Sequence, residues 1–201
     1  MSKLSGDIWS APEKLKGEVN TGFWEGSASL SPDGKTIYFS SERQGGLGGK
    51  DIYKANLNEE GFWVNCRNLG MEVNTFFDDD APFMHADGKT LFFCTMGYNS
   101  MGYNDIFMTQ YHKSDSTWSK PQNLGSPINT PDEDKYFVLN AEGNRGYYSS
   151  GRSKGQGLED IYEIKMPSNF LKPIAVTIKG KATKNGKPIE ATIKVEITGA
   201  H

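Results

Sequence analysis

The sequence is poor in the residues that most often carry chemistry. Among 201 residues there are three histidines and two cysteines, and 22 basic against 25 acidic side chains leave a net charge of −3. This near balance provides no basic surface for phosphates, so we expect no nucleic-acid partner. No apolar run of about 18 residues exists that would span a bilayer. The first ten residues, MSKLSGDIWS, lack the apolar segment of a signal peptide.

The few reactive side chains show no catalytic or metal-binding pattern. Cys66 and Cys94 have no metal-ligand spacing; we expect buried free thiols, with a bridge in an oxidising periplasm as the alternative. His85 lies beside an Asp-Gly turn, where we expect it to be packed or on the surface. A Gly-x-Ser-x-Gly elbow is absent. The sequence therefore predicts no catalytic residue, no metal site and no cofactor.

Aromatic residues and glycine are abundant instead. The chain has 11 phenylalanines, nine tyrosines and four tryptophans together with 23 glycines and nine prolines. This composition favours many short strands joined by tight turns.

A repeat with intervals of 54 and 55 residues organises the chain up to about residue 167. Four landmarks keep both intervals: Trp9, Trp63 and Trp118; Asn20-Thr21, Asn74-Thr75 and Asn129-Thr130; Asp33-Gly34, Asp87-Gly88 and Glu142-Gly143; and the triplets that begin at Asp51, Asp105 and Asp160. Such self-similarity is typical of repeat folds.

Each repeat reads as four short strands. The segments 36–41, 90–95 and 146–150 follow an Asp-Gly or Glu-Gly pair that suits a tight hairpin turn. A glycine-rich connection then leads to a third strand at DIY or DIF, and the tryptophan segment supplies a fourth. Four antiparallel strands in about 50 residues indicate propeller blades, so the fold class is all-β.

The repeat also resembles a known family. SPDGKTIYFSSERQGGLGGKDIY is similar to the WD-like, TolB-type Asp-Gly propeller repeat, and the fuller pattern resembles OmpA-like outer-membrane lipoproteins of Bacteroidetes-type bacteria. The resemblance covers about residues 9–166, in repeats of about 9–61, 62–117 and 118–167. It implies export to the periplasm and association with the outer membrane, in a protein that a further domain anchors to peptidoglycan.

The composition changes at residues 167–173, which marks a domain boundary. The segment 174–201 reads as a strand, an Asn185-Gly186 turn and a strand. It resembles the opening of a carboxypeptidase-regulatory-like β-sandwich and is too short to complete one. We therefore expect this chain to be a fragment that stops within its second domain.

Three blades do not close a ring, because propellers typically have four to eight. The Trp9 segment stands alone before the first full set of strands, and the last repeat lacks a tryptophan strand. One hypothesis is that these are blades of a larger, six-bladed propeller. The other is that two chains form a homodimer that completes one ring.

Three acids hold equivalent places just before the first strand of each repeat: Glu25, Asp79 and Asp134. Carboxylates that ring one mouth of a channel would raise one another's pKa or recruit a cation or basic peptide. Alternatively, each acid accepts hydrogen bonds from its own loop or from a neighbouring blade.

Other repeated residues have structural interpretations. We expect the aspartates at 51, 105 and 160 to cap amides of the preceding glycine-rich loop. The tryptophans at 9, 63 and 118 and the strand aromatics at 38–39, 92–93 and 147–148 should pack between blades. Trp24, Phe76 and Phe77 lie in loops and are candidates for exposed contact residues.

Together these features predict a non-catalytic scaffold of the periplasm or outer membrane that binds an envelope protein or peptide. The alternative is a propeller lyase or glycan hydrolase with an acidic, metal-assisted channel site. The sequence identifies neither the partner nor the number of blades in the parent protein.

Overall fold

The computed structural model describes residues 4–5, 7–140, 142–153, 155–167, 170, 183–184 and 187–188. Its elements are all strands: β1 (Leu4–Ser5), β2 (Ile8–Trp9), β3 (Glu25–Leu30), β4 (Thr36–Ser41), β5 (Asp51–Leu57), β6 (Trp63–Asn68), β7 (Asp79–Met84), β8 (Thr90–Thr95), β9 (Asp105–His112), β10 (Thr117–Trp118), β11 (Gln122–Asn123), β12 (Asp134–Leu139), β13 (Arg145–Ser150), β14 (Asp160–Lys165), β15 (Thr183–Lys184) and β16 (Lys187–Pro188). Within these residues no helix is long and apolar enough to cross a membrane.

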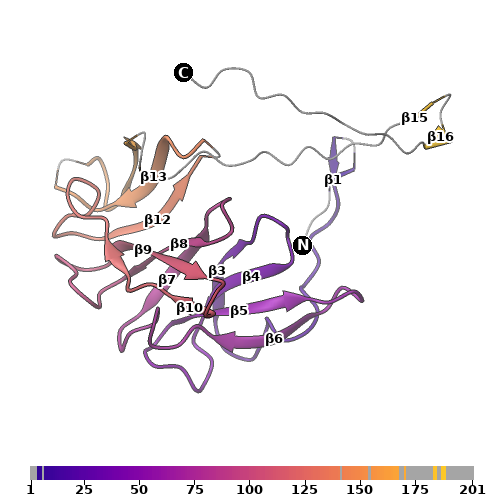
Figure 1. The fold of residues 1–201 in the computed structure, drawn as a ribbon. Coiled ribbons are helices and arrows are strands. Elements are labelled where there is room, and N and C mark those ends of the chain that lie inside the picture. The colour runs from indigo at the N-terminus through magenta and orange to yellow at the C-terminus, as the bar shows by residue number, and fades with distance from the viewer. Residues whose placement is uncertain are drawn as a thin grey trace.

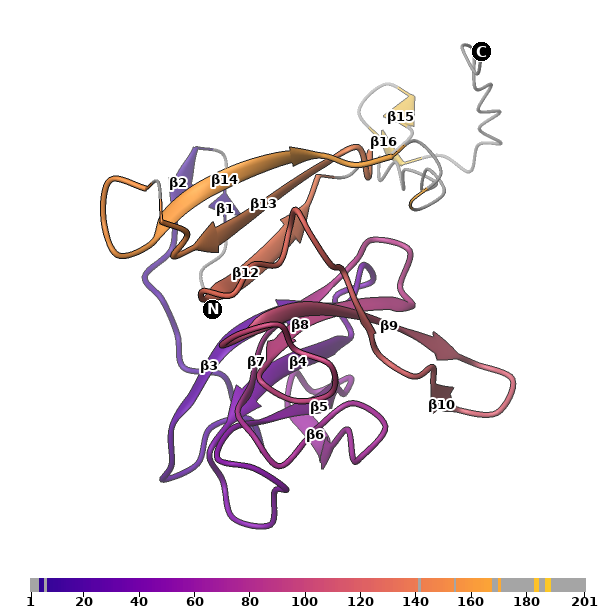
Figure 2. The same ribbon diagram turned by 90° about the vertical axis from the view of Figure 1, so that its left-hand side faces the viewer.

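Three antiparallel sheets follow one another along the chain and lie side by side (Figures 1 and 2). Blade one has the order β3-β4-β5-β6, blade two runs β7-β8-β9-β10 with β11 also paired to β9, and blade three is β12-β13-β14. Pro121, which has no N–H to donate, lies between β10 and β11. The predicted all-β, blade-like architecture is confirmed.

The predicted turns and strands are also confirmed. β4 and β8 have the predicted bounds, and β13 begins one residue earlier, at Arg145. The glycines of the three predicted turns, Gly34, Gly88 and Gly143, have φ angles of 68°, 67° and 68°. Only glycine adopts this left-handed region at little cost, so these turns depend on it.

The first strands of the three blades share a bulge at one position. Ser27, Ala81 and Tyr136 have φ angles of 48°, 53° and 58°, and the strand register shifts there in each blade. Residues 27–29, 81–83 and 136–138 together line a hollow of about 370 Å³. The inner strands of the blades therefore face a shared space, as in a propeller.

The aromatic residues pack mainly between blades, as expected. One core cluster, with Tyr38, Phe93 and Trp118, joins blades one and two, and a second, with Phe92 and Tyr148, joins blades two and three. Trp63 is buried on the other face of blade one.

The prediction for Trp9 is wrong. Its side chain is 66% exposed, and its strand β2 pairs with β1. A tryptophan strand is buried only where a blade receives it, and β2 joins none of the three blades.

Blade three has three strands in the part of the chain that the structure describes, so the expectation of three four-stranded repeats holds for blades one and two only. β15 and β16 form an antiparallel pair. The predicted turn at Asn185-Gly186 and most of the predicted sandwich at 174–201 lie outside the described residues.

Candidate functional site

The three predicted acids occupy the first position of the inner strands, and each closes a turn with the threonine four residues before it. In every blade the threonine donates its backbone N–H and its hydroxyl to the carboxylate: Thr21 to Glu25, Thr75 to Asp79 and Thr130 to Asp134. The N–H bonds to the two aspartates are 2.6 Å long. We call this unit the Thr–acid turn.

The same threonine also fixes the loop that precedes the strand. Its hydroxyl accepts the backbone N–H two residues later, from Phe23 at 3.1 Å, Phe77 at 3.1 Å and Asp132 at 3.3 Å. A chain of hydrogen bonds therefore runs from each acid through the threonine to the loop backbone.

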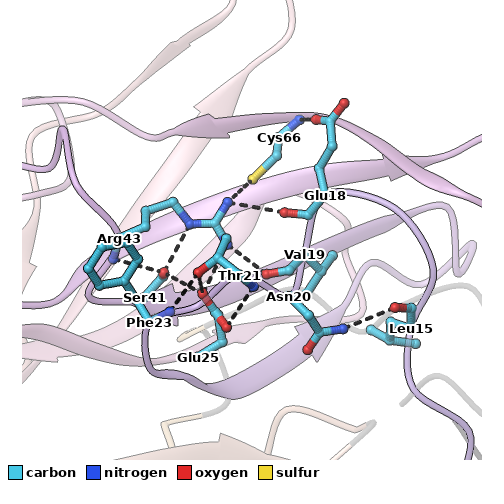
Figure 3. Close-up of polar contacts among 10 residues, drawn as sticks. All are labelled: Leu15, Glu18, Val19, Asn20, Thr21, Phe23, Glu25, Ser41, Arg43 and Cys66. Atoms are coloured by element: carbon cyan, nitrogen blue, oxygen red, sulfur yellow. Dashed lines mark hydrogen bonds and ion pairs between the residues drawn. The ribbon is translucent and has the colours of Figure 1, made fainter.

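An arginine completes the turn in blades one and three. Figure 3 shows Arg43, whose Nε donates to Ser41 at 2.9 Å and whose Nη2 donates to the Val19 carbonyl at 2.6 Å, with Glu25 3.6 Å away. Burial opposes the ionised form of Glu25, but the hydrogen bonds from Thr21 and the charge of Arg43 prevail and lower its pKa.

Blade three repeats this arrangement. Arg152 donates to Ser150 and to the Ile128 carbonyl, both at 2.9 Å, and lies 3.5 Å from Asp134. Val19 and Ile128 hold the same place, directly before the Asn-Thr pair. The two arginines therefore serve one shared structural task, although Gly97 at the equivalent place of repeat two had argued against a shared role.

Blade two has a different solution. Gly97 stands at the arginine position, and a Cβ there would lie 2.5 Å from Cγ2 of Thr75. The next residue, Tyr98, donates its hydroxyl to the Val73 carbonyl at 2.9 Å and so takes over one bond of the arginine. Among the described residues Asp79 has no basic partner, and burial raises its pKa to about 7 against the opposing hydrogen bonds of Thr75.

The asparagines before the threonines of blades two and three join neighbouring blades. Asn74 accepts the N–H of Ile52 at 2.8 Å and donates to its carbonyl at 3.0 Å. Asn129 makes both bonds to Ile106, each at 2.8 Å. Both asparagines are buried, and they satisfy the N–H groups of the two isoleucines, which would otherwise be costly to bury. The two isoleucine carbonyls also accept the N–H groups of Leu69 and Leu124. Asn20, at the start of blade one, instead donates to the Leu15 carbonyl at 3.0 Å.

The prediction that the third-strand aspartates cap the glycine-rich loops is confirmed. Asp51, Asp105 and Asp160 each accept the N–H of the residue four positions earlier, at 2.7, 2.8 and 2.7 Å.

Two interpretations of Glu25, Asp79 and Asp134 were open: a ligand site at a channel mouth, or acids that accept hydrogen bonds from their own loops. The structure shows the hydrogen bonds from their own loops. Asp79 and Asp134 are buried. Within the described residues no three His, Cys, Asp or Glu side chains gather closely enough to hold a metal ion. A role of these acids in binding a ligand stays a prediction.

The loop aromatics are exposed. Phe23, Trp24, Phe76 and Phe77 leave 48%, 41%, 74% and 51% of their surfaces in solvent. Gly48 of the blade-one glycine loop packs against the backbone at Phe77, so this loop lies beside the Thr–acid turn of blade two at one end of the blades. We call this end, residues 21–25, 43–50, 75–79 and 97–104, the loop face.

The histidine and the two cysteines that the sequence singles out lie in strands or directly after one. His85 is buried, with Nδ1 3.5 Å from the carboxylate of Asp87, and its backbone N–H donates to Thr90. Cys66 and Cys94 are both free thiols, as expected; Cys94 is buried, whereas Cys66 is partly exposed.

No family model and no curated protein matches the sequence. Among solved structures, TolB from Acinetobacter baumannii has 19% identity and a TM-score of 0.46, covering 70% of this chain and 29% of that one. A putative TolB from Agrobacterium tumefaciens has 16% identity and a TM-score of 0.50, covering 74% and 47%. An alpha-L-arabinofuranosidase from Lactobacillus brevis has 15% identity and a TM-score of 0.49, covering 85% and 62%.

At these identities a likeness shows the fold alone. The chain spans under half the length of the two TolB structures. The likeness to the Agrobacterium tumefaciens protein, together with the antiparallel sheets, shows that the chain is built of blades like those of TolB-type β-propellers.

Proposed function

We propose that the chain is a non-catalytic scaffold that binds a peptide or protein on its loop face. The observation that carries this proposal is the set of exposed aromatic side chains at Phe23, Trp24, Phe76 and Phe77. Two of them, Phe23 and Phe77, hold equivalent places in blades one and two. Aromatic residues on a rigid surface are typical hot spots of protein interfaces, because they bury a large area at little entropic cost.

The Thr–acid turns supply the rigidity. The backbone N–H groups of Phe23 and Phe77 are bonded to threonine hydroxyls, which are themselves bonded to the acids. A loop fixed before binding loses less conformational entropy when a partner docks. In this proposal the acids position the contact residues.

The experiment is a selection of peptides from a displayed random library on the immobilised chain, followed by calorimetric titration. The double variant Phe23→Ser/Phe77→Ser should weaken the selected peptides by about tenfold or more. The matched control is Phe62→Ser, an exposed phenylalanine in the turn between β5 and β6, at the opposite end of the blade. Peptides that bind the double variant as tightly as the unchanged chain would refute the proposal.

The location of the protein is part of the same proposal. The resemblance of the repeat to OmpA-like lipoproteins supports a periplasmic or outer-membrane-associated protein with an envelope partner. Fractionation of cells that express the native gene, with detection in the envelope, tests this part separately from peptide binding. The enzymatic alternative requires turnover of a polysaccharide that disappears in Glu25→Gln/Asp79→Asn/Asp134→Asn.

We also propose that two copies of the chain assemble head to tail. Ile52 and Ile106 are fully buried beneath the asparagine of the next blade, whereas Ile161, their equivalent in blade three, is 84% exposed. Asn20 is the matching asparagine of blade one, and within the described residues no isoleucine backbone bonds to it. Blade three thus offers an uncovered isoleucine and blade one an asparagine that could cover the isoleucine of a second copy. Two copies of three blades each would give a ring of six blades.

A further inference from the structure

A buried lysine lies between blades one and two. Lys54, on the third strand of blade one, is only 9% exposed. Among the described residues it has no ion pair and its ammonium donates no hydrogen bond. The ammonium makes a cation–π contact with Tyr111, whose ring centroid is 5.0 Å from Nζ. Buried lysines are usually paired, because an uncompensated charge is costly to bury.

The repeat shows that packing alone does not require a lysine here. The equivalent residue of blade two, 54 positions later, is Met108, which packs against the core between blades two and three. A methionine would fill the same space without burying a charge. The positive charge of Lys54 is therefore specific to this joint.

Two hollows open onto this lysine. The first, of about 340 Å³, lies beside the two Asp-Gly turns, and the second, of about 280 Å³, lies toward the outer strand. Lys54 and Tyr111 line both. Arg67, the cross-strand neighbour of Lys54, lines the second hollow, so two cations share one wall.

The acids near these hollows accept hydrogen bonds from groups other than Lys54. Asp33 accepts hydrogen bonds from Ser31 and Lys35, and Asp87 accepts them from Lys89 and Thr90. Glu72, in the second hollow, accepts the backbone N–H of Trp118 at 2.8 Å. None of these acids forms an ion pair with Lys54 among the described residues.

We propose that the second hollow binds a small oxyanion ligand, with its carboxylate or phosphate group between Lys54 and Arg67. Charge-assisted hydrogen bonds from the two cations would hold the anion, and the rings of Tyr111 and Trp118 form an apolar wall beside it. Burial, followed by the charge of Arg67, lowers the pKa of Lys54, and a bound anion would offset both effects.

The test is a ¹⁵N NMR titration of the full chain with three probes: inorganic phosphate, D-glucuronate and N-acetyl-L-phenylalanine. The proposal predicts saturable shifts on β5, β6 and around Ser116 with at least one probe, and the preferred probe distinguishes phosphate from carboxylate. In Lys54→Met the affinity should fall by about tenfold or more, the loss expected for one charge-assisted hydrogen bond.

The variant is designed to fold, because Met108 shows that the repeat accepts methionine at this place. The control is Lys35→Met, which removes an exposed lysine of the same blade that lines neither hollow. No saturable shift with any probe, or equal affinity in Lys54→Met, would overturn the proposal. Loss of affinity in both lysine variants would also overturn it, because that result indicates only a general effect of charge.

Discussion

Asp79 should make the stability of the chain depend on pH. Its side chain is fully buried, and burial raises its pKa from 3.8 to about 7. The equivalent acids have an arginine at 3.6 Å in blade one and 3.5 Å in blade three, whereas blade two has Gly97 in that place. A buried carboxylate without a cation favours its protonated form.

The sign of the effect follows from proton linkage. Between about pH 4 and pH 7 the folded chain holds a proton on Asp79 that the unfolded chain releases, so stability falls as the pH rises through this window. Stability contributed by the protonated acid is complete below pH 3.8 and is lost above about pH 7. At about 1.4 kcal/mol per pKa unit, a change from 3.8 to about 7 amounts to roughly 4 kcal/mol.

The assay is urea unfolding of the wild-type chain and Asp79→Asn at several pH values from about 5 to about 8. Asparagine resembles the protonated acid, so the free energy of unfolding should fall with pH in the wild type relative to the variant, and above pH 7 the variant should be more stable. Taking the difference between the two proteins removes the other titrating groups.

Asp134→Asn is the matched control. It makes the same change in the same turn, but it leaves Arg152 without its anion, so the variant should be less stable than the wild type above pH 7. If the wild type and Asp79→Asn lose stability in parallel across the range, the reasoning about burial in blade two is wrong.

Two further changes test the joints between blades. Asn74→Ala leaves the N–H of Ile52 buried without a partner, while the Ile52 carbonyl keeps the N–H of Leu69, and should cost about 1–3 kcal/mol in urea unfolding. Asn20→Ala, which breaks a single bond to Leu15, should cost about 1 kcal/mol or less, and equal costs would contradict the bridging role. Ile161→Lys should convert the proposed head-to-tail dimer into a monomer in analytical ultracentrifugation, and a wild-type chain that is already monomeric would refute the dimer.

The backbone of the blades could be predicted because local rules decide it. Strand-forming aromatic and β-branched residues after an Asp-Gly turn specify β4 and β8 without reference to the rest of the molecule, although both strands are buried on both faces. Trp9 could not be predicted in this way, because a repeated tryptophan is buried only if a neighbouring strand receives it. The repeat identified the tryptophan and its spacing. Whether its side chain is buried depends on a strand that is distant in the chain.

The site was predictable to the level of its positions. The spacing identified the three acids and their shared place, and two interpretations of them remained open. Whether an acid holds its own loop or presents a free charge depends on its hydrogen-bond partners. The spacing of the repeat does not reveal those partners. Nor does the spacing reveal that Tyr98 replaces an arginine, because the substitute stands one residue later and uses different chemistry.

The difference between the blades has a consequence for the loop face. The backbone of Phe23 is bonded to a Thr–acid turn in which Arg43 balances the charge of Glu25. The backbone of Phe77 is bonded to a Thr–acid turn whose acid, Asp79, has no cation beside it among the described residues. Deprotonation of Asp79 places an unpaired buried negative charge in the Thr–acid turn of blade two and not in that of blade one. The free-energy cost of burying that charge favours conformations in which the acid reaches water. The aromatic residues of blade two should therefore be held less firmly above about pH 7 than those of blade one. A partner that contacts both blades would lose affinity as the pH rises, through pre-organisation of the loop and without any contact to Asp79 itself.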